Sequence, residues 1–182
     1  MNAHFESLKT KNLHLKLIDV DDASFIIELK TNPGLNQFLS KIEPDLLTQE
    51  KWLKDYKVRS AEGSEYYFLI KNNASDKVGL VRVYDINDRV FSWGSWILKT
   101  GCPKSYPIES ALLIYEFGFK CLKLQMSVFE VLKENEKVMS FHLKTKAKIV
   151  RSDDEKVYFE FNEESFQNLK FKYKKFKFQE TV

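Results

Sequence analysis

Apolar and polar positions alternate in the first half of the chain in a way that predicts β-strands. The first strand is expected at Leu13–Ile18, where alternate positions are apolar. Three more apolar runs follow one another, at Glu65–Asn72, residues 77–86 and residues 90–98. Only short turns rich in Asn, Asp and Ser separate them, and such turns are typical of hairpins. We therefore expect three antiparallel strands in succession.

Between the first and second strands, the spacing of apolar residues changes to that of helices. Apolar residues from Phe25 to Leu29 follow an acidic stretch and predict a helix that ends before Pro33, because proline disfavours a helical conformation in the preceding residue. An N-cap at Thr48 and apolar residues around Trp52 predict a second helix. Residues 35–47 are predicted to be irregular.

The second half of the chain predicts a buried helix, a strand, a further helix and a hairpin. Ile108–Cys121 is apolar on most of its helical surface, which is typical of a buried helix. Leu124–Val131 is expected to be a strand, and Asn135 to begin a helix that reaches His142. Strands within residues 147–161 form the last hairpin. This order predicts an α+β fold class (α/β sandwich) with a mixed, mostly antiparallel central sheet of about seven strands flanked by helices.

The C-terminal stretch alternates aromatic and basic residues. Phe166, Leu169, Tyr173 and Phe176 follow a helical 3,4,3 spacing behind a cap at Asn162. The interleaved lysines raise the alternative of RNA or an anionic membrane surface as a partner. A docked terminal helix with a solvated basic face is the favoured interpretation.

Composition places the chain among globular proteins and excludes several classes. The 182 residues, 43% apolar and 30% charged, predict a single domain over residues 1–182. A net charge of +3 is too small to indicate nucleic acid. The chain shows no signal peptide and no apolar run long enough for membrane insertion. Cys102 and Cys121 are too few for a disulfide scaffold, so a reducing cytoplasm is expected.

The stretch Trp93–Phe119 predicts a strand, a short loop containing Gly, Pro and Ser, and then the buried helix. The first-turn N–H groups of a helix lack intrahelical partners, and the helix dipole favours negative charge there. The sequence therefore indicates a site for a phosphate-bearing ligand at residues 99–107.

The order of elements and the strand–loop–helix pattern WILKTGCPKSYPIESALL together resemble the GNAT superfamily of acyl-coenzyme A-dependent N-acetyltransferases. The resemblance implies that acetyl-CoA is the co-substrate, that no metal is needed and that direct transfer makes Cys102 a loop filler rather than a nucleophile. At the family's Gln/Arg and two Gly positions this chain has Cys102, Ser105 and Pro107. The residues implied to bind the coenzyme are Trp96, Ile97, Leu98, Cys102, Pro103, Lys104, Ser105, Tyr106 and Asn135.

The segment SVFEVLKENEKVMSFHLKTKAKIV carries the resemblance further. Asn135, Phe141 and His142 occupy the family's Asn, Phe and Tyr positions. The resemblance implies that His142 protonates the departing thiolate, as the family's Tyr does. The alternative is a histidine that only lines a pocket or fills the core. No general base can be identified from the sequence.

The acceptor of this family usually binds between the first two helices and the splayed strands. On that side the candidate residues are Asn36, Phe38, Arg82, Tyr84, Ser92 and Trp93. The segments SWGSWIL and ESALLIYEFGF look most like acetyltransferases of bacterial surface-glycan pathways, which implies the amino group of a nucleotide-linked deoxysugar as acceptor. The alternatives are the N-terminal amine of a ribosomal-type protein and a non-catalytic module that binds acyl-CoA. A homodimer is implied by the resemblance alone.

Overall fold

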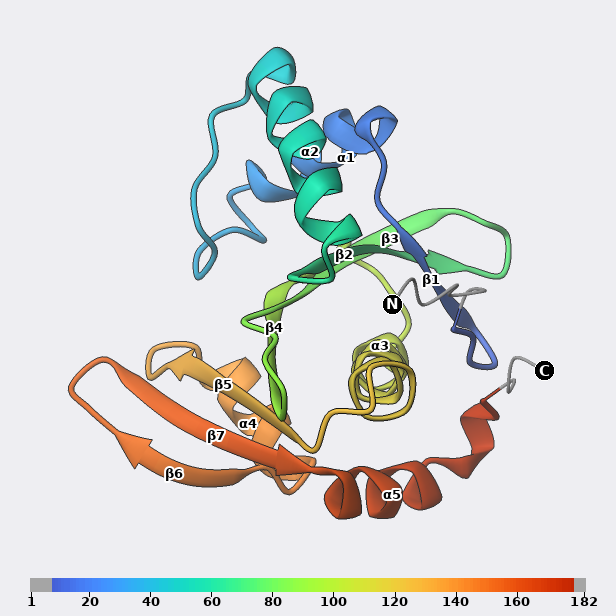
Figure 1. Cartoon of the computed structure of the whole chain (residues 1–182), viewed down its shortest axis with the longest axis vertical. Coiled ribbons are helices and arrows are strands. Elements are labelled where there is room, and N and C mark those ends of the chain that lie inside the picture. The colour runs from blue at the N-terminus through green and yellow to red at the C-terminus, as the bar shows by residue number, and fades with distance from the viewer. Residues whose placement is uncertain (1–7, 179–182) are drawn as a thin grey trace.

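One mixed sheet organises residues 8–178, the part of the chain that the computed structural model describes. Its strands lie in the order β1-β2-β3-β4-β5-β7-β6 (Figure 1). All neighbouring pairs are antiparallel except β4 and β5, which are parallel. The predicted mixed, mostly antiparallel seven-stranded sheet is therefore confirmed. The strands are β1 (Leu13–Leu17), β2 (Tyr66–Asn72), β3 (Lys77–Tyr84), β4 (Val90–Leu98), β5 (Met126–Leu132), β6 (Lys148–Ser152) and β7 (Lys156–Asn162).

Helices cover both faces of the sheet. α1 (Ala23–Lys30) and α2 (Leu46–Ala61) lie over one face of β1–β3, whereas α3 (Tyr106–Glu116) lies on the other face, between the two halves of the sheet (Figure 1). Strand alternation supplies both cores, because Tyr67 and Leu69 pack with α1 and α2 while Phe68 and Ile70 pack with α3. α4 (Glu136–Lys144) and α5 (Glu163–Lys172) complete the fold beside the second half of the sheet.

The start of α2 differs from the prediction. The N-cap is Asp45, whose carboxylate accepts a hydrogen bond of 2.7 Å from the backbone amide of Thr48. Thr48 is therefore the residue that the cap satisfies, and the predicted cap at Thr48 was wrong by three positions. Both residue types are good caps. Asp45 is the cap because α2 begins at Leu46, which makes Thr48 the third helical residue and leaves its amide without an intrahelical partner.

The C-terminal segment docks against the body of the protein as predicted, but its helix is shorter. Asn162 caps α5 by accepting a hydrogen bond of 2.9 Å from the amide of Ser165. The helix ends at Lys172, and a 3₁₀ turn over Lys174–Phe176 buries the Phe176 ring in the core. The carbonyl of Phe176 accepts a 2.6 Å hydrogen bond from the backbone amide of Lys11, which links the last turn to the segment just before β1.

Within residues 8–178, none of the helices combines the length and the apolar character that crossing a bilayer requires.

Candidate active site

The central feature of the site is the point where β4 and β5 separate. These parallel strands pair only through Val90 with Met126 and Phe91 with Ser127. Beyond these pairs the strands diverge, and Figure 1 shows β4 turning away from β5. Backbone groups of both strands then face the opening instead of a neighbouring strand, and such groups are available to a ligand.

A bulge in β4 decides which side chains face this opening. The register between β3 and β4 shifts between Leu80 and Arg82, and Ser95 adopts a positive φ of 46°. In a regular strand, residues three apart point to opposite faces, but the extra residue of a bulge changes the alternation. Trp93 and Trp96 therefore lie together, with ring centroids 5.5 Å apart. The Trp96 indole N–H donates to the Ser110 hydroxyl at 3.1 Å, which anchors it on α3.

A cleft of about 520 Å³ opens between β4, β5, α4 and the loop before α2. Three of the six predicted acceptor residues, Phe38, Tyr84 and Trp93, line it. Its other lining residues are Leu39, Ser40, Gly94, Ser95, Trp96, Phe129, Glu130, Val131, Leu132, Asn135, Val138, His142 and Lys156. The lining combines aromatic and aliphatic side chains with polar groups in similar measure, and such a mixture can both bind and orient a small molecule.

The other three predicted acceptor residues have different places. The Asn36 side chain donates to the carbonyl of Lys30 at 3.1 Å and so closes the end of α1. Arg82 binds the Glu65 carboxylate with its Nε at 2.7 Å. Ser92 is buried and lines a separate cavity of about 260 Å³ that shares Tyr84 with the cleft. These residues do not line the cleft itself.

A second, larger groove of about 840 Å³ runs past the first turn of α3. Four of the residues predicted to bind coenzyme, Trp96, Leu98, Lys104 and Ser105, line it. Trp96 and Val138 also line the cleft, so the two cavities adjoin at these residues. The groove is also lined by Pro107, Ile108, Lys137, Val138, Ser140, Phe141, Lys144, Thr145, Tyr173, Lys175 and Phe176.

The groove therefore joins an apolar floor to four lysines, at positions 104, 137, 144 and 175. The N-terminus of α3 lies in the same wall and favours negative charge. A long ligand with phosphate groups at one end and an apolar arm fits this distribution. The residues of this groove can therefore hold coenzyme A, whose phosphates the lysines would neutralise.

The remaining predicted coenzyme residues lie elsewhere. Ile97 packs against the core of α1 and α2, and Tyr106 is buried in the other core. Cys102 packs on the core with its thiol 3.9 Å from the carbonyl of Val78. Pro103 is exposed and does not line the groove. Asn135 lines the cleft rather than the groove, and its side chain caps α4 by accepting from the amide of Val138 at 3.3 Å.

Sequence reasoning missed the lysines of α4 and the C-terminal wall of the groove. Lys137 and Lys144 are seven residues apart on one helix, and this spacing places both on one face. That signal was present in the sequence. Tyr173 and Lys175 carry no comparable local signal, because only the docking of the C-terminal segment brings them to the groove.

His142 lines the cleft from α4 and is almost completely buried, with 3% of its surface exposed. Burial lowers its pKa to about 3, because the charged form would lose its hydration. The imidazole is therefore neutral near pH 7. Its Nδ1 has no hydrogen-bond partner within residues 8–178. The role of His142 as a proton donor stays a prediction, and the neutral ring can exchange hydrogen bonds with a ligand.

The described side chains give little support to a cysteine nucleophile, to Glu109 as a base or to a metal site. Cys102 and Cys121 are free thiols, and burial raises the pKa of each, which disfavours the nucleophilic thiolate. Glu109 is fully buried in α3, and its carboxylate accepts hydrogen bonds from Thr10 and Asn12 at 2.8 Å. Within residues 8–178, no group of three or more His, Cys, Asp or Glu could hold a metal ion.

Comparison with known proteins identifies the family. A profile of the acetyltransferase (GNAT) domain matches residues 12–148. A solved structure described as apo FdhC, a nucleotide-linked sugar GNAT, is 41% identical and superposes with a TM-score of 0.87, covering 93% of this chain and 97% of its own. A search of curated protein sequences finds no match.

More distant structures share the fold. A spermidine N-acetyltransferase from Vibrio cholerae in complex with CoA and spermine has a TM-score of 0.73 at 17% identity, covering 86% of this chain and 98% of its own. A dodecameric form of the Vibrio cholerae enzyme gives 0.70 at 16% identity, covering 86% and 96%. The domain match and the 41% identical structure together show that the chain is an acetyltransferase that belongs to the GNAT superfamily, whose co-substrate is acetyl-CoA.

Proposed function

We propose that this enzyme transfers the acetyl group of acetyl-CoA to the primary amine of a nucleotide-linked amino sugar, for the synthesis of a surface glycan in the cytoplasm. The observation that carries the proposal is the 41% identity, over 93% of the chain, to a structure described as a nucleotide-linked sugar GNAT. The aromatic cleft supports it, because Trp93, Tyr84 and Phe38 offer ring faces and edges to a sugar or a nucleobase.

The two cavities divide the substrates between them. The lysine-lined groove takes the coenzyme and the aromatic cleft takes the acceptor, so that the thioester lies near Trp96, where they meet. Trp96 and the cleft-lining residues of the splayed strand β4 put backbone groups beside the thioester carbonyl. Fixed donors of this kind stabilise the oxyanion of a tetrahedral intermediate.

The reaction is a direct transfer. The neutral amine attacks the thioester carbonyl and forms the new C–N bond, after which the C–S bond breaks and the coenzyme leaves as thiolate. The amine gives up one proton and the thiolate takes one. Neutral His142 acts in this scheme through hydrogen bonding and by shaping the cleft. Glu130, which lines the cleft and is ion-paired with Lys156, offers a carboxylate to the acceptor amine before it loses its proton.

The test is release of free coenzyme A thiol from acetyl-CoA with three kinds of acceptor. We expect release with a nucleotide-linked amino sugar and none with spermidine or with a peptide that begins like a ribosomal protein. Turnover with the peptide or the polyamine instead would overturn the proposed acceptor. Tight coenzyme binding without turnover on any amine would indicate a binding module.

A further inference from the structure

The ammonium group of Lys30, at the end of α1, is buried but lacks a counter-charge. The residue is 9% exposed, and its Nζ donates to the Ser40 hydroxyl at 3.1 Å. It makes no ion pair with any carboxylate within residues 8–178. A buried ammonium without a counter-charge loses hydration that nothing replaces, and natural proteins normally compensate such a charge. Burial and the nearby Arg82 lower its pKa, which reflects the same imbalance.

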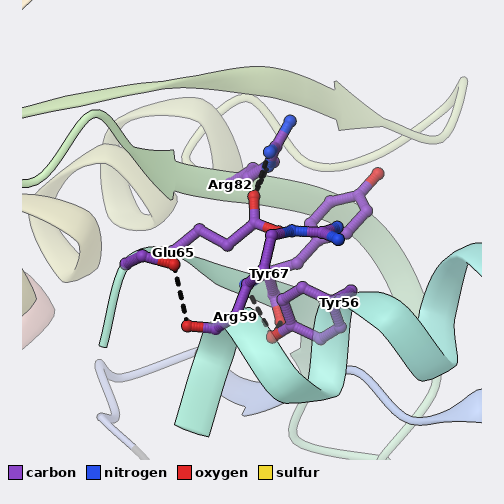
Figure 2. A network of polar contacts seen from close by, with 6 residues as sticks. Tyr56, Arg59, Glu65, Tyr67 and Arg82 are labelled. Carbon is purple, nitrogen blue, oxygen red and sulfur yellow. Dashed lines mark hydrogen bonds and ion pairs between the residues drawn. The ribbon is translucent and has the colours of Figure 1, made fainter. Parts of the chain in front are cut away.

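Positive charge also exceeds negative charge in the network beside Lys30. Figure 2 shows the Glu65 carboxylate between two arginines. This carboxylate is 3% exposed and accepts from Arg59 Nε at 2.5 Å and from Arg82 Nε at 2.7 Å. Two guanidinium groups therefore share one buried carboxylate, and the unpaired Lys30 ammonium adds a further positive charge near Arg82. The third guanidinium nitrogen of Arg82, Nη1, makes no hydrogen bond to the described residues, and 30% of that side chain is exposed.

These cations border the acceptor cleft. Ser40, the partner of Lys30, lines the cleft. Arg82 lies 5.3 Å from the ring centroid of Tyr84, another lining residue, and is the strand partner of Gly94, a third. The charged side chains of the cleft itself, Glu130 and Lys156, pair with each other and leave this excess uncompensated.

We propose that Lys30, Ser40 and Arg82 form an anion subsite at the edge of the acceptor cleft, and that it takes a phosphate group of the acceptor. The inference rests on the proposed function and extends it, because it assigns the diphosphate of a nucleotide-linked sugar to residues at the end of α1, in the loop before α2 and on β3. Guanidinium donors and a compact ammonium both suit phosphate oxygens. A polyamine acceptor meets repulsion at the same place, so the subsite also selects the class of amine.

The direct test is binding of inorganic pyrophosphate to the protein saturated with coenzyme A, so that the lysines of the donor groove are already occupied. Lys30→Met is expected to weaken this binding about tenfold or more, since it removes a charge-assisted contact in a desolvated place. Lys57→Met is the matched control, because Lys57 is exposed and pairs with Asp19 at 3.1 Å outside the cleft. Equal pyrophosphate affinity in Lys30→Met and in the unchanged protein would overturn the subsite.

A second variant keeps the test independent of folding. Ser40→Asp adds a carboxylate on an exposed loop residue that already contacts the Lys30 ammonium. The internal counter-charge is expected to raise the melting temperature and to abolish pyrophosphate binding. Pyrophosphate binding that is undiminished in Ser40→Asp would overturn the subsite, as would unchanged affinity in Lys30→Met.

Turnover separates this inference from the proposed function. If a nucleotide-linked amino sugar is acetylated and Lys30→Met leaves its KM unchanged, the subsite is wrong and the function stands. If no such sugar is acetylated but pyrophosphate binding still depends on Lys30, the subsite stands and the proposed acceptor is wrong.

Discussion

At the scale of single residues, His142 shows how surroundings decide chemistry. Its ring lies 4.3 Å from the centroid of Phe129, 5.4 Å from Trp93 and 5.8 Å from Phe159. Aromatic neighbours offer little hydration to a charged imidazolium, so the neutral form is favoured. The histidine at the family's tyrosine position is therefore neutral near pH 7, and its role as a proton donor stays a prediction.

The depressed pKa of His142 predicts a loss of stability in acid. The folded state binds the proton near pH 3, whereas the unfolded chain binds it near 6.5, so the contribution is present above pH 6.5 and is lost as the pH falls toward 3. Between pH 7 and pH 5 the loss amounts to about 2 kcal/mol. Urea unfolding of His142→Phe, compared with the unchanged protein at both pH values, checks it. From pH 7 to pH 5, the free energy of unfolding of the variant should fall by about 2 kcal/mol less than that of the unchanged protein. An equal fall in both proteins would contradict the buried neutral histidine.

At the scale of elements, β3 and β4 approach each other closely beside the site. Gly79 of β3 lies opposite Leu98, just past the bulge at Ser95. A Cβ atom added at Gly79 would lie 2.3 Å from the carbonyl oxygen of Ile97, which is backbone and cannot turn aside. The glycine therefore lets β4 approach closely where Trp96 and Leu98 meet the donor groove.

This close approach predicts that Gly79→Ala is strongly destabilising. The methyl group forces β3 and β4 apart, at a cost of about 2–4 kcal/mol in the free energy of unfolding, and the affinity for coenzyme A should fall as well. Gly34→Ala is the control, because its Cβ would meet only the Asn32 side chain at 3.3 Å, and a change below about 0.5 kcal/mol is expected. Urea denaturation measures both, and similar midpoints for the two variants would refute the packing argument.

At the scale of the whole molecule, the donor groove is assembled from three parts of the chain that are distant in sequence. The loop before α3 supplies Lys104, α4 supplies Lys137 and Lys144, and the C-terminal turn supplies Lys175. The C-terminal part lies outside residues 12–148, the range matched by the family profile. The docked tail thus does more than cover apolar surface, because it completes one wall of the proposed coenzyme site.

This assembly predicts that Lys175→Glu raises the KM for acetyl-CoA and leaves the KM for the acceptor unchanged. Reversing one charge near the phosphates should raise the KM for acetyl-CoA about tenfold at low salt and less at high salt, since ions screen exposed charges. Lys148→Glu, on the exposed strand β6, is the control and should change neither KM. A KM for acetyl-CoA that is unchanged in Lys175→Glu would exclude the tail from the donor site.

The part of the candidate site that comes from one continuous segment of the chain could be predicted from the sequence. Trp96, Leu98, Lys104 and Ser105 follow one another along the predicted strand and loop, and all line the groove. Ile97, between Trp96 and Leu98 in the sequence, faces the opposite core because a strand alternates its side chains. A prediction that takes a whole segment as the site includes Ile97, although the pleat of the strand turns its side chain away from the groove.

The amino-acid sequence by itself determined the order of strands and helices and the antiparallel hairpins, because periodicity and turn chemistry are local properties of the chain. Only the tertiary structure decided the burial of His142, the shared carboxylate of Arg59 and Arg82, and the lysine of the C-terminal wall. Burial and electrostatic imbalance arise from groups that are distant in sequence and adjacent in space. A pKa, a missing counter-charge and a composite groove therefore exist only once the chain is folded.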